Sequence, residues 1–326
     1  MRCRVFPPSL LDFGLVHAHR CIPRLCTFDR ARACDLLQRE QLCVKAQSLI
    51  APTQLSQASW QPSAMAPTRR IAALLLLQNH AAALAPPVVK AADVAASGLA
   101  SMARMPVAAG KSTTVVEGLA AYPAFRTPPV LYEFEACPYC RFVREAVTAL
   151  DLVVDVKPCG RGSRHRAEAR KLGGKEQFPL LVDGDTVLYE SADIVDYLAE
   201  KRGVTLAPPT GGVLASAAAT AFRPGRGDAV SAGALAKPPR KLLELYSYEG
   251  NQFCRLVREV LCELDLPYRL YSAGKDSPRR DVLAKLAGSS QCPYLIDPNT
   301  GEALAESADI VAYLCRTYGD FDEEEE

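Results

Sequence analysis

The sequence predicts an α/β protein built from two copies of one small domain, each with the element order βαβαββα. Three short segments carry this prediction, because each occurs twice at a nearly constant separation. CRFVRE at residues 140–145 returns as CRLVRE 114 residues later, and QFP at 177–179 returns as QCP at the same separation. ESADIV at 190–195 returns 116 residues later, and the two additional residues lie in a turn, where insertions are tolerated.

The first half of each copy is predicted as a βαβ unit. Residues 130–135 alternate sufficiently between apolar and polar side chains to form a strand. Residues 138–150 place apolar side chains at helical spacing, and the β-branched residues of 152–156 favour a second strand. A crossover between parallel strands is right-handed, so the helix packs on one face of the sheet.

The second half of each copy is predicted as αββα. Residues 163–172 indicate a polar, arginine-rich helix that a Gly-Gly pair ends. Residues 180–182 and 186–189 form a hairpin through an Asp-Gly turn. Ser191 is expected to cap the last helix, which has apolar residues on one face. The result is a small mixed sheet with helices on both sides.

Composition sets the predicted boundaries. Residues 1–128 contain 14 Lys or Arg against 6 Asp or Glu and lack the patterning of a core, so we predict a disordered leader. The two domains are predicted at 129–203 and 241–320. Residues 204–240, rich in Ala, Gly and Pro, are predicted to be a linker, and residues 321–326 an acidic tail.

The leader has the features of a targeting segment. Residues 41–92 contain no acidic side chain, which is typical of organelle transit segments. An internal start at Met65 would place Arg69-Arg70 before an apolar run and a small-residue cleavage site. We therefore expect a cleaved leader that starts at Met1 or at Met65. Cytoplasmic location or a secretory route is the alternative.

Composition also argues against several classes of protein. The 38 Lys and Arg nearly balance the 37 Asp and Glu, so no overall positive charge indicates nucleic acid as a partner. No apolar run reaches the roughly 18 residues of a membrane span. The 12 cysteines are too sparse for a disulfide scaffold, and with only 4 histidines we predict no metal site.

Cys137-Pro138-Tyr139-Cys140 lies between the first strand and the first helix of copy one. A thiol at this place faces the positive end of the helix dipole, which favours its thiolate. The second cysteine follows one turn later and can attack a mixed disulfide formed on the first. A C-x-x-C pair can also be half of a zinc ribbon, but the sequence has no second such pair, so we favour redox chemistry.

Three motifs together resemble a known family. CPYC after a strand, Pro179 before the third strand and Glu190-Ser191 at the last helix look like a glutaredoxin crossed with the N-terminal domain of glutathione S-transferases. The near-repeat is similar to tandem proteins of this type in plant and algal plastids. The resemblance implies two thioredoxin-like domains, a cis Pro179 and a destination in the plastid stroma.

The resemblance also implies a glutathione site. Cys137 and Cys140 would be catalytic, with glutathione as co-substrate and no tightly bound cofactor. Disulfide-bearing or glutathionylated proteins would be the partners. The backbone of Phe178 would pair with the tripeptide, and Glu190 and Ser191 would hold its γ-glutamyl end. The implied glutathione-binding residues are Tyr139, Gln177, Phe178, Pro179, Glu190 and Ser191.

The activity has two alternatives. In a glutathione transferase-like reaction, Cys137 would activate bound glutathione without net redox change. In a non-catalytic module, the same fold would only bind glutathione or a protein. One departure from glutaredoxins concerns the rate: Glu135-Ala136 stands where a lysine is common, and a nearby carboxylate disfavours a thiolate. Arg141 and Arg144 could offset that charge.

The second copy is expected to lack a dithiol redox centre of the CPYC kind. Aligned on Cys254, it has Asn251 in the position of Cys137, and an amide cannot form a thiolate. Cys292, directly before the second expected cis-proline, could serve as a substitute thiol. We otherwise expect a role in binding, packing or partner choice, with the equivalents of the glutathione site at Gln291, Pro293, Glu306 and Ser307.

Overall fold

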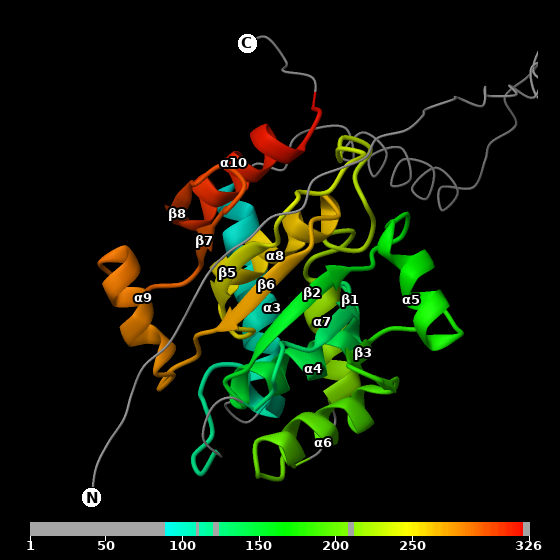
Figure 1. Ribbon diagram of the computed structural model, residues 1–326. Coiled ribbons are helices and arrows are strands. Elements are labelled where there is room, and N and C mark those ends of the chain that lie inside the picture. Colours follow the sequence, from blue (N-terminus) through cyan, green and yellow to red (C-terminus); the bar gives the residue numbers. More distant parts are fainter. Residues whose placement is uncertain (1–88, 109–110, 120–123, 208–211, 322–326) are drawn as a thin grey trace, which may run out of the picture. The chain divides into compact units, whose positions relative to one another are not determined.

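The computed structural model describes residues 89–321, except 109–110, 120–123 and 208–211. Residues 1–88 of the predicted leader, which include Met65 and Arg69-Arg70, and residues 322–326 of the predicted acidic tail lie outside the described residues. The described chain contains two thioredoxin-like domains, each with the predicted element order (Figure 1).

The two domains correspond element by element. The first contains β1 (Val130–Glu133), α4 (Pro138–Ala149), β2 (Val153–Pro158), α5 (His165–Gly173), β3 (Leu180–Asp183), β4 (Thr186–Leu188) and α6 (Ser191–Lys201). The second contains β5 (Leu243–Ser247), α8 (Gln252–Glu263), β6 (Tyr268–Ser272), α9 (Arg279–Ala287), β7 (Tyr294–Ile296), β8 (Ala303–Ala305) and α10 (Ser307–Tyr318).

The two domains share one eight-stranded sheet with the order β4-β3-β1-β2-β6-β5-β7-β8. Within each domain the first two strands are parallel and the third is antiparallel to the first. The sheets join because β2 and β6 pair antiparallel, with Val153 opposite Tyr271 and Val156 opposite Tyr268. Pairing these two edges satisfies backbone groups that would otherwise be open to aggregation.

One hydrophobic core spans both domains. It lies between one face of the sheet and α4, α6, α8 and α10, and it includes Leu131, Leu198, Leu245 and Leu314. Side chains alternate between the faces of a strand, so neighbouring residues point to the other side. There Tyr132 and Leu180 pack against α5, and Tyr246 belongs to a separate cluster with Leu283 of α9.

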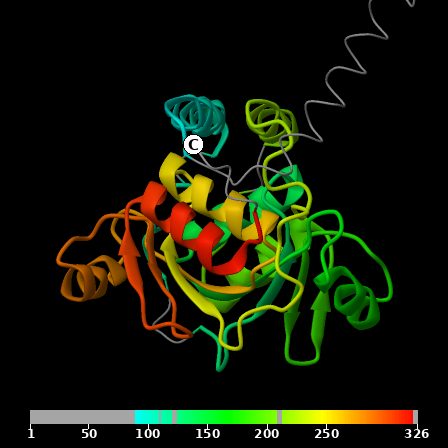
Figure 2. The ribbon, with the colours of Figure 1, turned by 90° about the horizontal axis from the view of Figure 1, so that it is seen from above.

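Two helices lie outside the predicted domains. α3 (Ala91–Ala108) falls in the predicted leader, and α7 (Gly212–Ala221) falls in the predicted linker. The leader and linker boundaries are therefore wrong in these two places. Figure 2 shows the helices side by side, above the layer formed by α8 and α10. Both are rich in Ala, Ser and Gly, a composition that resembles a linker but permits close packing of helices.

The two helices are exchanged between the domains. α3 precedes the first domain in sequence, yet its Ser97 Oγ donates to the Gln252 carbonyl of α8 at 2.8 Å. α7 precedes the second domain, and its Ser216 Oγ donates to the Pro138 carbonyl of α4, also at 2.8 Å. Each helix therefore packs on the first helix of the other domain.

Two arginines also link each helix to the domain that follows it in sequence, so that each helix contacts both domains. Arg104 of α3 makes a bidentate ion pair with Glu145 of α4, at 2.7 and 2.8 Å. Arg223, which follows α7, makes the matching pair with Glu259 of α8, at 2.5 and 2.9 Å. The internal repeat thus extends to the helices, where equivalent residues are 119 rather than 114 apart.

Candidate active site

Cys137 lies at the N-terminus of α4. The chain leaves β1 at Glu133 and reaches Cys137 in an extended conformation, with φ −69° and ψ 120°. Pro138 begins the helix, where its missing N–H has no helical partner to lose. The Sγ atom of Cys137 accepts a hydrogen bond from the backbone N–H of Cys140 at 3.3 Å. The sulfur is therefore the N-cap acceptor of the helix.

The two thiols of CPYC differ in acidity. The pKa of Cys137 is lowered, chiefly by a hydrogen bond from the Cys140 side chain. Burial opposes this shift, while the amides of Cys140 and Tyr139 and the charge of Arg144 support it. Burial raises the pKa of Cys140 well above its ordinary value. Cys137 therefore ionises first, which suits it to nucleophilic attack.

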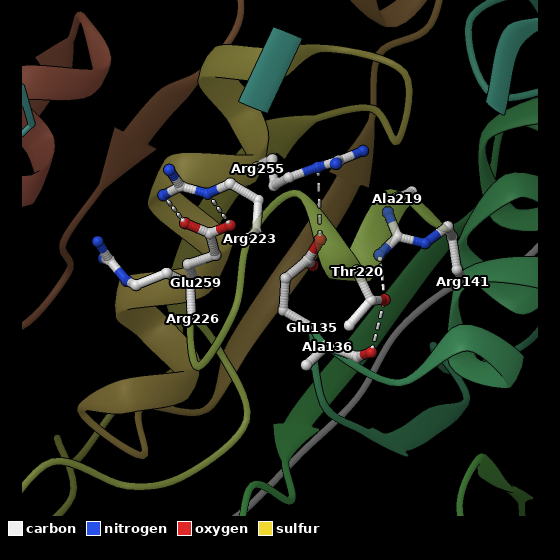
Figure 3. A pocket seen from close by; sticks show the side chains of 9 residues that line it. All are labelled: Glu135, Ala136, Arg141, Ala219, Thr220, Arg223, Arg226, Arg255 and Glu259. Carbon is white, nitrogen blue, oxygen red and sulfur yellow. Dashed lines mark hydrogen bonds and ion pairs between the residues drawn. The ribbon is translucent and has the colours of Figure 1, made fainter. Parts of the chain in front are cut away.

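Helix α7 holds the loop that carries Cys137. Thr220 Oγ1 donates to the carbonyl of Ala136 at 2.9 Å, and Ser216 Oγ donates to that of Pro138. Figure 3 shows Thr220 against Ala136. Cys137 itself is only 4% exposed. Neither hydroxyl was predicted from the sequence. The signal for them is the repeat at a separation of 119 residues, which matches Ser97 to Ser216 and Ser101 to Thr220.

A buried ion-pair cluster lies behind the loop. Arg144 donates to Glu133, to the backbone of Glu135 and, at 2.9 Å, to Glu249 of the second domain. Arg258 of the second domain donates to Glu135 at 2.9 Å and to Glu249 at 2.8 Å. The second domain therefore supplies two members, Glu249 and Arg258, to the buried ion-pair cluster behind the first domain's thiols.

This cluster corrects the expectation about Glu135. Glu135 does not disfavour the Cys137 thiolate, because Arg144 and Arg258 compensate its charge. Although burial raises the pKa of Glu135, these arginines outweigh burial and lower it. Arg141 is also buried. Its Nε donates to Ser216 Oγ at 3.2 Å, and its Nη1 donates to Glu249 Oε1 at 3.3 Å.

Arg255 is the counterpart of Arg141 and is paired less completely. Its side chain is only 2% exposed, and its nearest carboxylate oxygens, on Glu135 and Glu249, lie 3.9 Å away. Among the described residues its Nε and Nη1 have no hydrogen-bond partner. Figure 3 shows its side chain extending toward Arg141 across the small pocket. Burial and the charge of Arg141 lower the pKa of Arg255 to about 10.

The loop before β3 lies beside the end of β1. The Phe178–Pro179 peptide bond is cis, as the resemblance implies. β3 pairs with β1 so that Leu180 is opposite Tyr132, which brings Phe178 near the CPYC loop. The ring of Phe178 packs edge-on against Phe134, with ring centroids 6.2 Å apart. The guanidinium of Arg166 lies over the same ring, 5.1 Å from its centre.

Glu190, rather than Ser191, occupies the N-cap position of α6. The expectation that Ser191 caps the helix is wrong, because Ser191 is already its first residue. Glu190 has a left-handed backbone (φ 62°), and its side chain makes no capping bond within the described structure. Its carboxylate instead accepts a hydrogen bond from Gln177 Nε2 at 2.6 Å. Tyr139 is 48% exposed and packs edge-on against Phe142.

The second domain repeats this backbone with other side chains. Asn251 is the N-cap of α8, and its Oδ1 accepts from the N–H groups of Phe253 and Cys254 at 2.8 and 3.1 Å. The Cys292–Pro293 bond is also cis. Glu306 has the same left-handed backbone as Glu190, and Ser307 begins α10. Gln291 is exposed before the cis bond.

Three further cysteines of the described chain have no proposed role in the site. Cys159, Cys262 and Cys315 are buried, and burial raises the pKa of each thiol, which indicates packing roles. The described residues contain no cluster of three or more potential metal ligands. No helix in the described part of the chain is long and apolar enough to cross a membrane.

Comparison with known proteins identifies the two domains. The model of the family "Glutathione S-transferase, N-terminal domain" matches residues 131–209 and 245–324. No curated protein matches the chain. A solved structure, "Leishmania TDR1 - a unique trimeric glutathione transferase", is 14% identical over 60% of this chain and 68% of its own length. Its TM-score is 0.22. The chain carries two tandem domains of the glutathione S-transferase N-terminal domain family, which is thioredoxin-like in fold and glutathione-related in function.

Proposed function

We propose that the first domain is a glutathione-linked thiol–disulfide oxidoreductase. The observation that carries this proposal is the pair Cys137 and Cys140 at the N-terminus of α4. Cys137 Sγ accepts a hydrogen bond from the Cys140 amide at 3.3 Å, and the pKa of Cys137 is below its ordinary value. A sulfur held as a hydrogen-bond acceptor at a helix N-terminus is stabilised as a thiolate, and the thiolate is the reactive form.

The reaction transfers two electrons in two displacements. The Cys137 thiolate attacks one sulfur of a protein disulfide or glutathionylated thiol, the S–S bond breaks, and one thiolate leaves and takes up a proton. Cys140 then loses its proton and attacks Cys137 Sγ, which releases the second thiol and leaves a Cys137–Cys140 disulfide. Two glutathione molecules reduce this disulfide and leave as glutathione disulfide. Alternatively, one glutathione resolves the mixed disulfide directly.

Glutathione is proposed to bind between the cis-proline loop and α6. The backbone of Phe178 would pair with the cysteinyl part of the tripeptide. The amide of Ser191, at the start of α6, favours the α-carboxylate of the γ-glutamyl end, and Glu190 can pair with its ammonium group. The left-handed backbone of Glu190 supports this site, because such non-glycine conformations concentrate at functional positions.

The test measures glutathione-dependent reduction of a glutathionylated peptide by the full chain. Cys137→Asn is the sharpest variant, because Asn251 shows that an asparagine can cap the equivalent helix. We expect Cys137→Asn to keep the thermal midpoint and lose the activity. Cys140→Ser should retain the glutathione-resolved route. Cys159→Ser is the matched control, because that thiol is buried and its pKa is raised.

The alternatives predict other results. Full disulfide reduction by Cys137→Asn would contradict the proposal. Conjugation of glutathione to an electrophile without disulfide reduction would indicate a transferase. Glutathione binding without either reaction would indicate a binding module.

We also propose that the protein acts in a plastid. The support is the acid-poor leader and the resemblance to plastid tandem proteins. Fluorescent fusions that start at Met1 and at Met65 test this location. Plastid signal from either fusion supports it, and cytosolic signal from both contradicts it.

A further inference from the structure

The second domain contains two thiols that the proposed function does not use. Cys254 is fully buried in the first turn of α8, the position that Cys140 holds in α4. Cys292 is partly exposed and precedes Pro293, in the position that Phe178 holds in the first domain. Both are free thiols.

Asn251 holds the two cysteine-bearing segments together. Its Oδ1 accepts from the N–H of Cys254 at 3.1 Å, and its Nδ2 donates to the carbonyl of Cys292 at 3.3 Å. One amide therefore fixes the start of α8 against the loop before β7. Each of the two thiols shifts the pKa of the other. The Sγ atom of Cys292 also donates to the carbonyl of Ala273, which follows β6, at 4.0 Å. In the first domain the corresponding place is filled by the aromatic ring of Phe178.

The surroundings polarise this pair of thiols. Burial raises the pKa of Cys254, but hydrogen bonds from Cys292 and Ser247 and the charge of Arg258 outweigh it and lower the pKa. The neighbouring Cys254 side chain and burial both raise the pKa of Cys292. Cys254 is therefore the more acidic thiol of the pair, and Cys292 is the more accessible one.

We propose that Cys254 and Cys292 form a second dithiol–disulfide centre that reacts with small disulfides of the glutathione disulfide class. This goes beyond the proposed function, because the reacting atoms belong to the other domain and to a different pair of positions. In the second domain Asn251 stands in the position of Cys137, and the second thiol, Cys292, lies in the loop before the cis-proline.

The reaction begins at the accessible thiol. Cys292 Sγ attacks one sulfur of glutathione disulfide while its proton passes to the neighbouring Cys254 thiolate, and one glutathione thiolate leaves. The Cys254 proton then passes to that thiolate or to water. Cys254 Sγ attacks Cys292 Sγ, and the second glutathione thiolate leaves. The two protein thiols are oxidised by two electrons to one disulfide, and one glutathione disulfide is reduced to two glutathione molecules.

The test uses the full chain, because α3 packs on α8 and residues 241–320 alone would lack it. The reduced protein is equilibrated with mixtures of glutathione and glutathione disulfide and quenched with acid. Free thiols are then alkylated, and peptides are identified by mass spectrometry. We expect Cys254 and Cys292 to lose alkylation together and to appear as one disulfide-linked peptide pair. This readout is independent of the proposed function, since Cys137 and Cys140 lie on other peptides.

Single variants sharpen the result. Cys292→Ser should leave Cys254 reduced, and Cys254→Ser should trap a stable glutathione adduct on Cys292. Cys262→Ser, a buried thiol later in α8, is the matched control and should leave the linked pair unchanged. The proposal is overturned if Cys254 stays alkylated under conditions that fully oxidise Cys137 and Cys140. A glutathione adduct on Cys292 of the natural chain, with Cys254 still free, also overturns it.

Discussion

In the first domain the N-cap acceptor of α4 is the sulfur of Cys137, and in the second domain the N-cap acceptor of α8 is the amide oxygen of Asn251. Both atoms accept the amide of the cysteine three residues later, at 3.3 and 3.1 Å. The position therefore has a structural task and a chemical task, and the second copy keeps only the structural one. A polar acceptor is enough to begin the helix, whereas thiolate chemistry needs sulfur.

The buried arginines behind the two sites also differ in their hydrogen-bond partners. Arg144 and Arg258 are equivalent, but Arg144 has Glu133 as an additional partner, whereas Arg258 has the hydroxyl of Ser247. Both arginines share Glu249, so neither domain balances its charges alone. The second domain is thus part of the electrostatic support of the first.

The largest effect on this comparison is expected from Glu249→Ala. The carboxylate accepts from Arg144 and Arg258, and their charges lower its pKa although burial opposes the shift. Its removal leaves buried guanidinium groups without their shared partner, at a cost of about 3–5 kcal/mol in the free energy of unfolding. Urea denaturation measures this cost. Glu168→Ala, which breaks the exposed pair with Lys157, is the control and should cost less than about 1 kcal/mol. Equal effects of the two substitutions would show that the cluster does not hold the domains together.

A smaller effect, confined to the first domain's site, is expected from removing the hydroxyls of α7. Ser216→Ala and Thr220→Val each remove one hydrogen bond to the loop around Cys137, worth about 0.5–1.5 kcal/mol. The freed loop should make Cys137 more accessible and speed its alkylation. Ser97→Ala is the matched control, because it removes the equivalent bond from the second domain. If Ser97→Ala accelerates Cys137 alkylation as much as Ser216→Ala does, α7 has no specific influence on the site.

The smallest effect concerns the pH dependence of Cys137. Because its pKa is lowered, its alkylation rate should reach half-maximum at a pH below that of an unperturbed cysteine, about 8.5. Below that midpoint the thiolate fraction and the rate fall as pH decreases. Cys140→Ala removes the largest cause of the shift and should move the midpoint to higher pH. An unchanged midpoint in Cys140→Ala would contradict the role of the Cys140 hydrogen bond.

Much of each domain could be predicted from local patterns. The repeated motifs, the alternation in β1, the turn-forming pair between β3 and β4 and the position of Cys137 before α4 all depend on neighbours within a few residues. Boundaries moved by only one or two residues in most elements, as expected where helix ends fray. The cap of α6 was the exception, because Glu190 adopts a left-handed backbone that propensity does not favour.

The sequence by itself determined that this chain contains two related domains and that only the first has a CPYC thiol pair. Tertiary structure alone decided that β2 and β6 join the sheets, that α3 and α7 are exchanged, and that Arg141 and Arg144 are buried rather than solvated. It also brought the segments of Cys254 and Cys292 together through Asn251. The physical reason is the range of the interactions: periodicity and caps act within a few residues, whereas these contacts join segments 38 to more than 100 residues apart. Helices made of Ala, Ser and Gly have no distinctive pattern of their own and are stabilised by the surface on which they pack.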